Sequence, residues 1–156
     1  MKDCAFPLEK GRIFKNKQTC SDGKKYEGHW SQEGMRDGYG ILNNGDGTLY
    51  EGYWQDNKFH GKGRHIDIDG GVYEGDWIGG KKEGQGIYYY VGGGKYEGGW
   101  MMDLKMGFGV QHWSNGNKYE GQWCDKRHGE GTYTYANGSK RCAVYENGNR
   151  VKWTSH

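Results

Sequence analysis

The sequence predicts an all-β fold: an elongated, solenoid-like twisted ribbon in which about six β-hairpin repeats form a single-layer antiparallel meander. Three observations lead to this prediction. One segment type recurs about every 23 residues. Glycine supplies 31 of the 156 residues, roughly three times its usual share. The apolar residues are largely aromatic, with 13 Tyr, 7 Trp and 4 Phe, whereas a disordered chain has few aromatic residues and a high net charge.

The first strand of each repeat is predicted by the pentapeptide Tyr-Glu-Gly-x-Trp. Intact copies begin at Tyr26, Tyr50, Tyr73, Tyr96 and Tyr119. Alternate side chains of a strand share one face, so Tyr, Gly and Trp lie together and Glu lies on the other side. A sixth, degenerate copy begins at Arg141, with Ala143 in place of the glycine and Tyr145 in place of the tryptophan.

The second strand is predicted by a Gly-x-Gly element six to eight residues after each tryptophan. Seven residues further on comes another glycine, usually preceded by Asp or Asn. These pairs are Asp46-Gly47, Asp69-Gly70, Gly92-Gly93, Asn115-Gly116 and Asn137-Gly138. They predict hairpin turns, because glycine tolerates the positive φ that tight turns require. We expect the glycines inside the strands to leave room for large rings lying flat across the sheet.

The three landmarks, in register over five periods, resemble the MORN repeat (membrane occupation and recognition nexus). The resemblance runs from about Asp22 to Gly148. It divides the chain into an N-terminal extension or cap (1–21), a repeat array (22–148) and a C-terminal tail (149–156). The repeats start near residues 26, 50, 73, 96, 119 and 141. Residues 1–21 either cap the first hairpin or dock onto another protein.

Composition limits the classes of partner and compartment. The net charge of +2 gives no strong field for nucleic acid. No stretch approaches the roughly 20 apolar residues of a membrane span. The beginning of the chain has no apolar signal segment, and the four cysteines form no Cys-x-x-Cys pair. We therefore expect a cytoplasmic protein with reduced thiols.

Candidate catalytic and metal-binding residues have simpler structural explanations. Five glutamates recur in register: Glu27, Glu51, Glu74, Glu97 and Glu120. They are predicted to lie about 10 Å apart, too far to share a proton or an ion. We expect them to pair across strands with Lys58, Lys81, Lys105 and Lys126.

Histidines, cysteines and glycine-rich loops also give no clear site. His60 and His128 share a repeat position but are three periods apart. An approach of Cys124 to Cys142 across neighbouring strands is a weak hint of a metal site, and no other His or Cys pair has zinc spacing. Gly92-Gly93-Gly94-Lys95 opens no helix, as a phosphate loop would. The sequence therefore predicts no catalytic residue, no cofactor, no metal and no enzyme activity.

The candidate binding surface is the aromatic face of the ribbon, whose rings are also expected to form the core. Tyr and Trp are favoured in interface hot spots, and an extended peptide or an amphipathic helix along this face is the expected partner. The residues predicted for it are Tyr50, Trp54, Tyr73, Trp77, Tyr96, Trp100, Tyr119 and Trp123.

The leading functional hypothesis is a non-enzymatic structural scaffold that binds other proteins of a larger assembly. The family resemblance implies a cytoskeletal setting, such as a ciliary or flagellar axoneme and its radial spokes. The alternative is a peripheral membrane module that binds anionic phospholipids. A regulatory subunit of a separate enzyme is not distinguished from the scaffold. Exposed terminal strands also allow a homo-oligomer.

Overall fold

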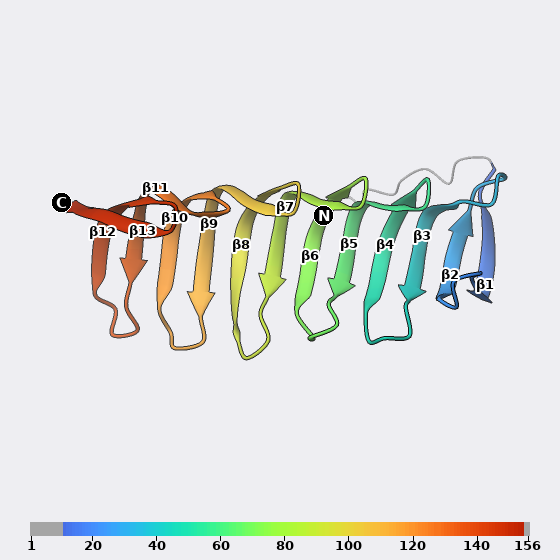
Figure 1. Ribbon diagram of the computed structural model, residues 1–156, viewed down its shortest axis with the longest axis horizontal. Coiled ribbons are helices and arrows are strands. Elements are labelled where there is room, and N and C mark those ends of the chain that lie inside the picture. The colour runs from blue at the N-terminus through green and yellow to red at the C-terminus, as the bar shows by residue number, and fades with distance from the viewer. Residues whose placement is uncertain (1–10, 155–156) are drawn as a thin grey trace, which may run out of the picture.

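One antiparallel sheet contains all the strands of the computed structural model, which describes residues 11–154. The 13 strands lie side by side in the order of the sequence, and each pairs with the next (Figure 1). None of the described residues forms a helix. The predicted all-β, single-layer, elongated meander is confirmed.

The strands alternate between the two predicted types. The pentapeptide strands are β2 (Lys25–Trp30), β4 (Leu49–Gln55), β6 (Val72–Ile78), β8 (Gly94–Met101), β10 (Lys118–Cys124) and the degenerate β12 (Lys140–Glu146). The strands that carry Gly-x-Gly are β3 (Arg36–Asn43), β5 (Lys58–Ile66), β7 (Lys81–Tyr89), β9 (Leu104–Trp113) and β11 (Lys126–Thr134).

The sheet extends beyond the predicted repeat array at both ends. Strand β1 (Ile13–Thr19) pairs with β2, and β13 (Asn149–Thr154) pairs with β12. The sheet therefore begins inside the predicted N-terminal extension and ends inside the predicted tail. Residues 1–10 lie outside the described residues, so a capping or docking role for that segment stays a prediction.

Two kinds of turn alternate along the sheet. Two-residue turns follow most pentapeptide strands, and both of their residues have positive φ, between 49° and 87°: Asp56-Asn57, Gly79-Gly80, Met102-Asp103 and Asn147-Gly148. This is the geometry of the hairpin turns that match strand twist. The other turns contain the predicted Asp-Gly and Asn-Gly pairs. At Asp69-Gly70 the carboxylate of Asp69 accepts a hydrogen bond from the N–H of Gly71 at 3.1 Å, which explains the preference for Asp or Asn there.

Each pentapeptide tyrosine lies flat over glycines of its own and the next strand. A Cβ added to Gly86 would lie 2.4 Å from Oη of Tyr73, and one added to Gly75 would lie 2.5 Å from it. The Tyr73 hydroxyl donates a hydrogen bond to the carbonyl of Asp76 at 3.1 Å. The indole N–H of Trp77 donates to the carbonyl of Gly63 at 3.2 Å. The strand glycines are therefore required by the rings, as predicted.

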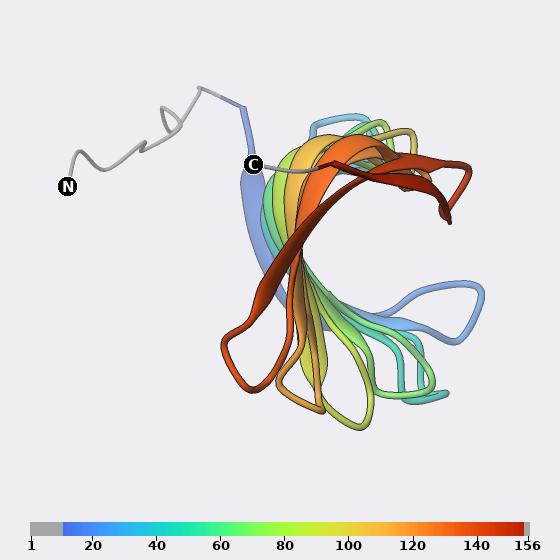
Figure 2. The ribbon, with the colours of Figure 1, turned by 90° about the vertical axis from the view of Figure 1, so that its left-hand side faces the viewer.

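The rings interlock from one repeat to the next. Tyr73 meets Trp77 of its own repeat and Trp100 of the following repeat, both edge to face, with ring centroids 5.0 and 5.2 Å apart. The same contacts occur for Tyr26, Tyr50 and Tyr96. The core is therefore a continuous line of rings on one face of a sheet that curls into an open arc (Figure 2).

Candidate functional site

The face that carries these rings is called the ring face here, and the opposite face the glutamate face. All eight residues predicted as the partner-binding surface are buried on the ring face, and none is more than 7% exposed: Tyr50, Trp54, Tyr73, Trp77, Tyr96, Trp100, Tyr119 and Trp123. They form the core, and their contact with a partner stays a prediction. A partner on this face would first meet the side chains that cover the rings.

Those covering side chains occupy one position in each repeat. This cover row consists of Arg36, Phe59, Lys82, Lys105 and Arg127. Nζ of Lys105 lies 4.6 Å from the ring centroids of both Tyr96 and Trp123. In the second repeat Phe59 replaces the cation and stacks on Tyr50, with centroids 3.7 Å apart. The ring face therefore presents cations that lie over the faces of aromatic rings, which attract them electrostatically.

Burial makes the two lysines of the cover row weaker bases. It lowers the pKa of Lys105 to about 8, although the carboxylate of Asp125 opposes the shift. It also lowers the pKa of Lys82, against the opposing charges of Asp67 and Asp103. These ammonium groups are partly removed from water. These ammonium groups are therefore incompletely solvated where an anionic group of a partner would contact them.

The glutamates of the glutamate face have partners other than the predicted lysines. Glu74 pairs with Arg64 at 3.0 Å, Glu97 with Lys95 at 2.9 Å and Glu120 with Lys118 at 2.8 Å. Glu51 accepts a hydrogen bond from the Tyr39 hydroxyl at 2.6 Å.

The prediction that the glutamates pair with Lys58, Lys81, Lys105 and Lys126 was wrong. Lys81 pairs with Asp103, and Lys105 lies on the ring face. The reason is register. Lys58, Lys81 and Lys126 lie opposite Gln55, Ile78 and Cys124, each four residues beyond the glutamate of that strand. Lys105 lies opposite Trp100, and a shift of one residue moves a side chain to the other face.

The residues considered for metal binding are dispersed. No group of three potential metal ligands occurs within residues 11–154. Cys20, Cys124 and Cys142 are free thiols, and Cys4 lies outside the described residues. Cys142 approaches Thr132, with Sγ and Oγ1 3.5 Å apart.

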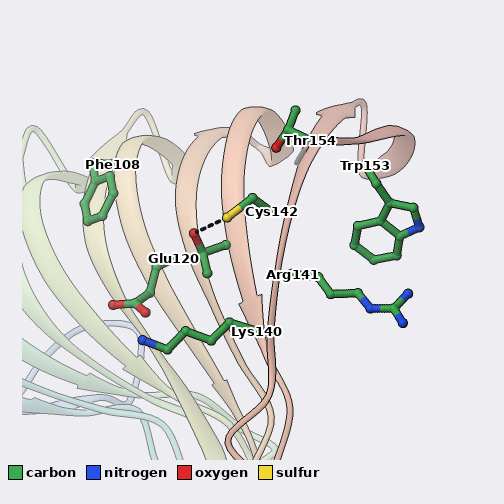
Figure 3. A pocket seen from close by; sticks show the side chains of 8 residues that line it. Phe108, Glu120, Lys140, Arg141, Cys142, Trp153 and Thr154 are labelled. Atoms are coloured by element: carbon green, nitrogen blue, oxygen red, sulfur yellow. Dashed lines mark hydrogen bonds between the residues drawn. The ribbon is translucent and has the colours of Figure 1, made fainter. Parts of the chain in front are cut away.

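Two hollows at the C-terminal end were not predicted from the sequence. The first has a volume of about 850 Å³ and is lined by Phe108, Glu120, Thr132, Lys140, Arg141, Cys142, Trp153 and Thr154 (Figure 3). The second, on the ring face, has a volume of about 300 Å³ and is lined by Arg127, Tyr133, Tyr135, Tyr145, Arg150 and Trp153. Both depend on β13, which carries no repeat signature that would have revealed them.

A single-layer sheet built from in-register repeats, with side chains presented at a regular spacing, defines a repeat-based binding module. The MORN repeat model matches residues 26–48, 50–72, 73–95, 96–118 and 119–140, more than half of the chain. The protein therefore belongs to the MORN-repeat family, whose repeats are typical of modules that bind proteins or membranes.

Comparison with curated proteins gives no match. Among solved structures, the chain is similar to the TCP domain of SAS-4 (dCPAP) of Drosophila melanogaster, solved in complex with a proline-rich motif of Ana2 (dSTIL). The identity is 16%, the TM-score is 0.42, and 90% of each chain is covered. This likeness carries no argument about binding. No helix that would reach across a lipid bilayer is found within residues 11–154.

Proposed function

We propose that the protein is a non-enzymatic scaffold that binds other proteins of a larger assembly along its ring face. The observation that carries this proposal is the cover row, in which each repeat presents one side chain over rings at equivalent positions. Two strands per repeat advance the row by roughly 10 Å. An extended peptide or an amphipathic helix is long enough to contact several of these positions at once.

Photocrosslinking tests this proposal directly. Phe59 belongs to the cover row, whereas Phe108 is 60% exposed on the glutamate face. Each would be replaced in turn by the photoreactive analogue p-benzoylphenylalanine in the full chain, expressed in its own cells. We expect protein adducts from position 59 and few from position 108. Adducts only from position 108, or none from either position, would contradict the proposal.

The second candidate function is binding to anionic phospholipid, which the four cations of the cover row favour. Each basic residue near an anionic surface contributes about 1 kcal/mol, and this attraction is screened by salt. Flotation with phosphatidylserine vesicles at low salt, lost at high salt, is expected for a membrane module. A protein complex that depends on aromatic contacts would persist at high salt.

For location, we propose a cytoplasmic, cytoskeleton-associated protein of a cilium or flagellum, on the basis of the family resemblance alone. The test is extraction of cells with non-ionic detergent at physiological salt. Retention in the cytoskeletal pellet is expected. Complete release with the membrane lipids would favour the phospholipid alternative.

A further inference from the structure

The C-terminal end of the ring face carries three arginines that form no ion pair with any carboxylate the structure describes. Arg127, Arg141 and Arg150 take part in none of the ion pairs within residues 11–154. In the central repeats the situation differs, because Asp67 and Asp103 act on Lys82. Within the described residues, the last hairpins therefore hold three arginines without an ion-paired carboxylate.

Two of these arginines line a hollow of aromatic side chains, and the third lies over one of its rings. The guanidinium carbons of Arg141 and Arg150 lie 5.1 and 4.1 Å from the centroid of the Trp153 ring. Arg127 lies 4.7 Å from the ring centroid of Tyr145 and donates a hydrogen bond to the carbonyl of Gly148. Arg127 and Arg150 line the hollow of about 300 Å³ together with Tyr133, Tyr135, Tyr145 and Trp153. Guanidinium groups fixed on rings keep several N–H donors available for a carboxylate.

The hollow adjoins an open edge of the sheet. Strand β13 pairs with β12 on one side and is the last strand of the described sheet. Its outward N–H and C=O groups are available to a further strand. Val151, in the middle of this edge strand, is 59% exposed.

The charge order of the sheet indicates which kind of strand fits there. Of the five strands that carry Gly-x-Gly, β5 and β9 contain basic residues and no acid, whereas β3, β7 and β11 each contain one acid. Both β5 and β9 lie between two pentapeptide strands that contain glutamate. Strand β13 also contains basic residues and no acid, through Arg150 and Lys152, but it has such a neighbour on one side only. Charge complementarity across strands therefore favours a glutamate-bearing extended strand at this edge.

A second copy of this chain does not supply that strand at its own edge. The other open edge, β1, carries Lys15 and Lys17 and no acid. Pairing β13 with β1 or with another β13 would therefore bring like charges together, which is unfavourable across strands.

We propose that the β13 edge and the adjoining arginine–tyrosine hollow bind an extended acidic segment of a partner protein. The segment adds to the sheet as a further strand and places its carboxylates against Arg141 and Arg150. This inference rests on the proposed scaffold function, because it names the partner chemistry at one end of the same face.

The test uses the full chain and a twelve-residue peptide in which Glu alternates with Thr, so that all carboxylates share one face of a strand. The comparison peptide has Gln in place of Glu. We expect the Glu peptide to bind at least about tenfold more tightly, consistent with charge-assisted bonds. Hydrogen exchange should slow within residues 149–154 on binding. The double variant Arg141→Gln, Arg150→Gln should lose about tenfold or more in affinity.

A matched control separates site from net charge. Lys25→Gln, Lys58→Gln changes the net charge equally at two exposed positions far from β13 and should leave the affinity unchanged. Equal binding of the two peptides, equal losses in the two double variants, or protection spread along β4–β10 would overturn the inference. So would a preference of the arginine site for phosphatidylserine vesicles, or peptide-free self-association that masks residues 149–154 in sedimentation and exchange experiments.

Failure here is distinguishable from failure of the scaffold function. If position 59 still gives protein adducts while the Glu peptide does not bind, only the acidic-strand inference is overturned. If both fail, the scaffold proposal fails as well.

Discussion

The central repeats and the degenerate sixth copy place different side chains at equivalent positions of one sheet. In the centre, each tyrosine lies between two tryptophans over a glycine floor. In the sixth copy, Tyr145 takes the tryptophan position and meets Tyr119 edge to face at 5.1 Å, but Arg141 takes the tyrosine position. The line of rings ends there, whereas the covering cations continue to Arg150. The ring core and the cation cover are therefore separable features of the repeat.

The largest expected effect concerns the glycine floor. In Gly98→Ala the new Cβ would lie 2.6 Å from Cα of Gly109 and 2.8 Å from the carbonyl oxygen of Phe108. Both are backbone atoms, so we expect a loss of about 3 kcal/mol or more in the free energy of unfolding. The equivalent residue of the sixth copy is already alanine, and Ala143→Gly should cost about 1 kcal/mol or less. Urea unfolding measures both, and equal losses would remove the distinction between the two regions.

The next effect concerns the rings themselves. Trp77→Phe removes the hydrogen bond to Gly63 and part of the contact with Tyr50 and Tyr73. A loss of about 2 to 3 kcal/mol is expected. Tyr145→Phe keeps the edge contact with Tyr119 and should cost about 1 kcal/mol or less. Thermal unfolding of the two variants measures which loses more stability. A larger loss in Tyr145→Phe would contradict the assignment of the main core to the central repeats.

A smaller effect separates lysine from arginine in the cover row. The pKa of Lys105 is about 8 in the folded protein, against an ordinary value of 10.5. Between these values the unfolded chain binds more protons, so stability rises with pH through this range. We expect the melting temperature of the wild type, relative to that of Lys105→Met, to rise as the pH is raised from 7.5 to 9.5.

Arg127→Met is the matched control, since arginine stays protonated throughout this range. Its difference from the wild type should not change with pH. Parallel profiles for the wild type and Lys105→Met would show that Lys105 titrates as it does in water.

The smallest effect is expected on the glutamate face. Arg64 and Glu74 are each 45% exposed at their side chains, so Arg64→Gln should change stability by less than about 0.5 kcal/mol. Thr132 holds the equivalent position near the C-terminus, beside Glu120, and Thr132→Arg should be as nearly neutral. A change above 1 kcal/mol in chemical denaturation at either site would show that this face contributes more than solvent-screened pairs.

The repeat fold was predictable because its period, glycines and Asp-Gly turns are all visible in the sequence. The cover row was visible too, since Arg36, Phe59, Lys82, Lys105 and Arg127 recur at nearly constant steps. It was missed because its chemistry varies at Phe59 and because Lys105 was aligned one residue out of register. In the fifth copy Asp125 alone, with φ of 62°, forms the turn, which shortens the step.

The terminal strands and the arginine–tyrosine hollow were not predictable in the same way. An edge strand has one neighbour and needs no glycine floor, so β1 and β13 lack the repeat pattern. The hollow is lined by Tyr145 of β12 and by Arg150 and Trp153 of β13. The shape of the hollow depends on how β13 folds back on β12, and no repeat pattern in the sequence predicts that fold-back.

The strict sequential order of the strands has a mechanical consequence. The main contacts join only strands that are adjacent in the sequence, and β1 and β13 lie at opposite ends of the ribbon (Figure 1). Tension applied between these ends acts along the hydrogen bonds and across the strands. Strands would therefore detach one at a time from an end of the sheet, while the remaining repeats stay folded. A ribbon roughly 60 Å long would thus lengthen in small steps under load, and each step would release one strand.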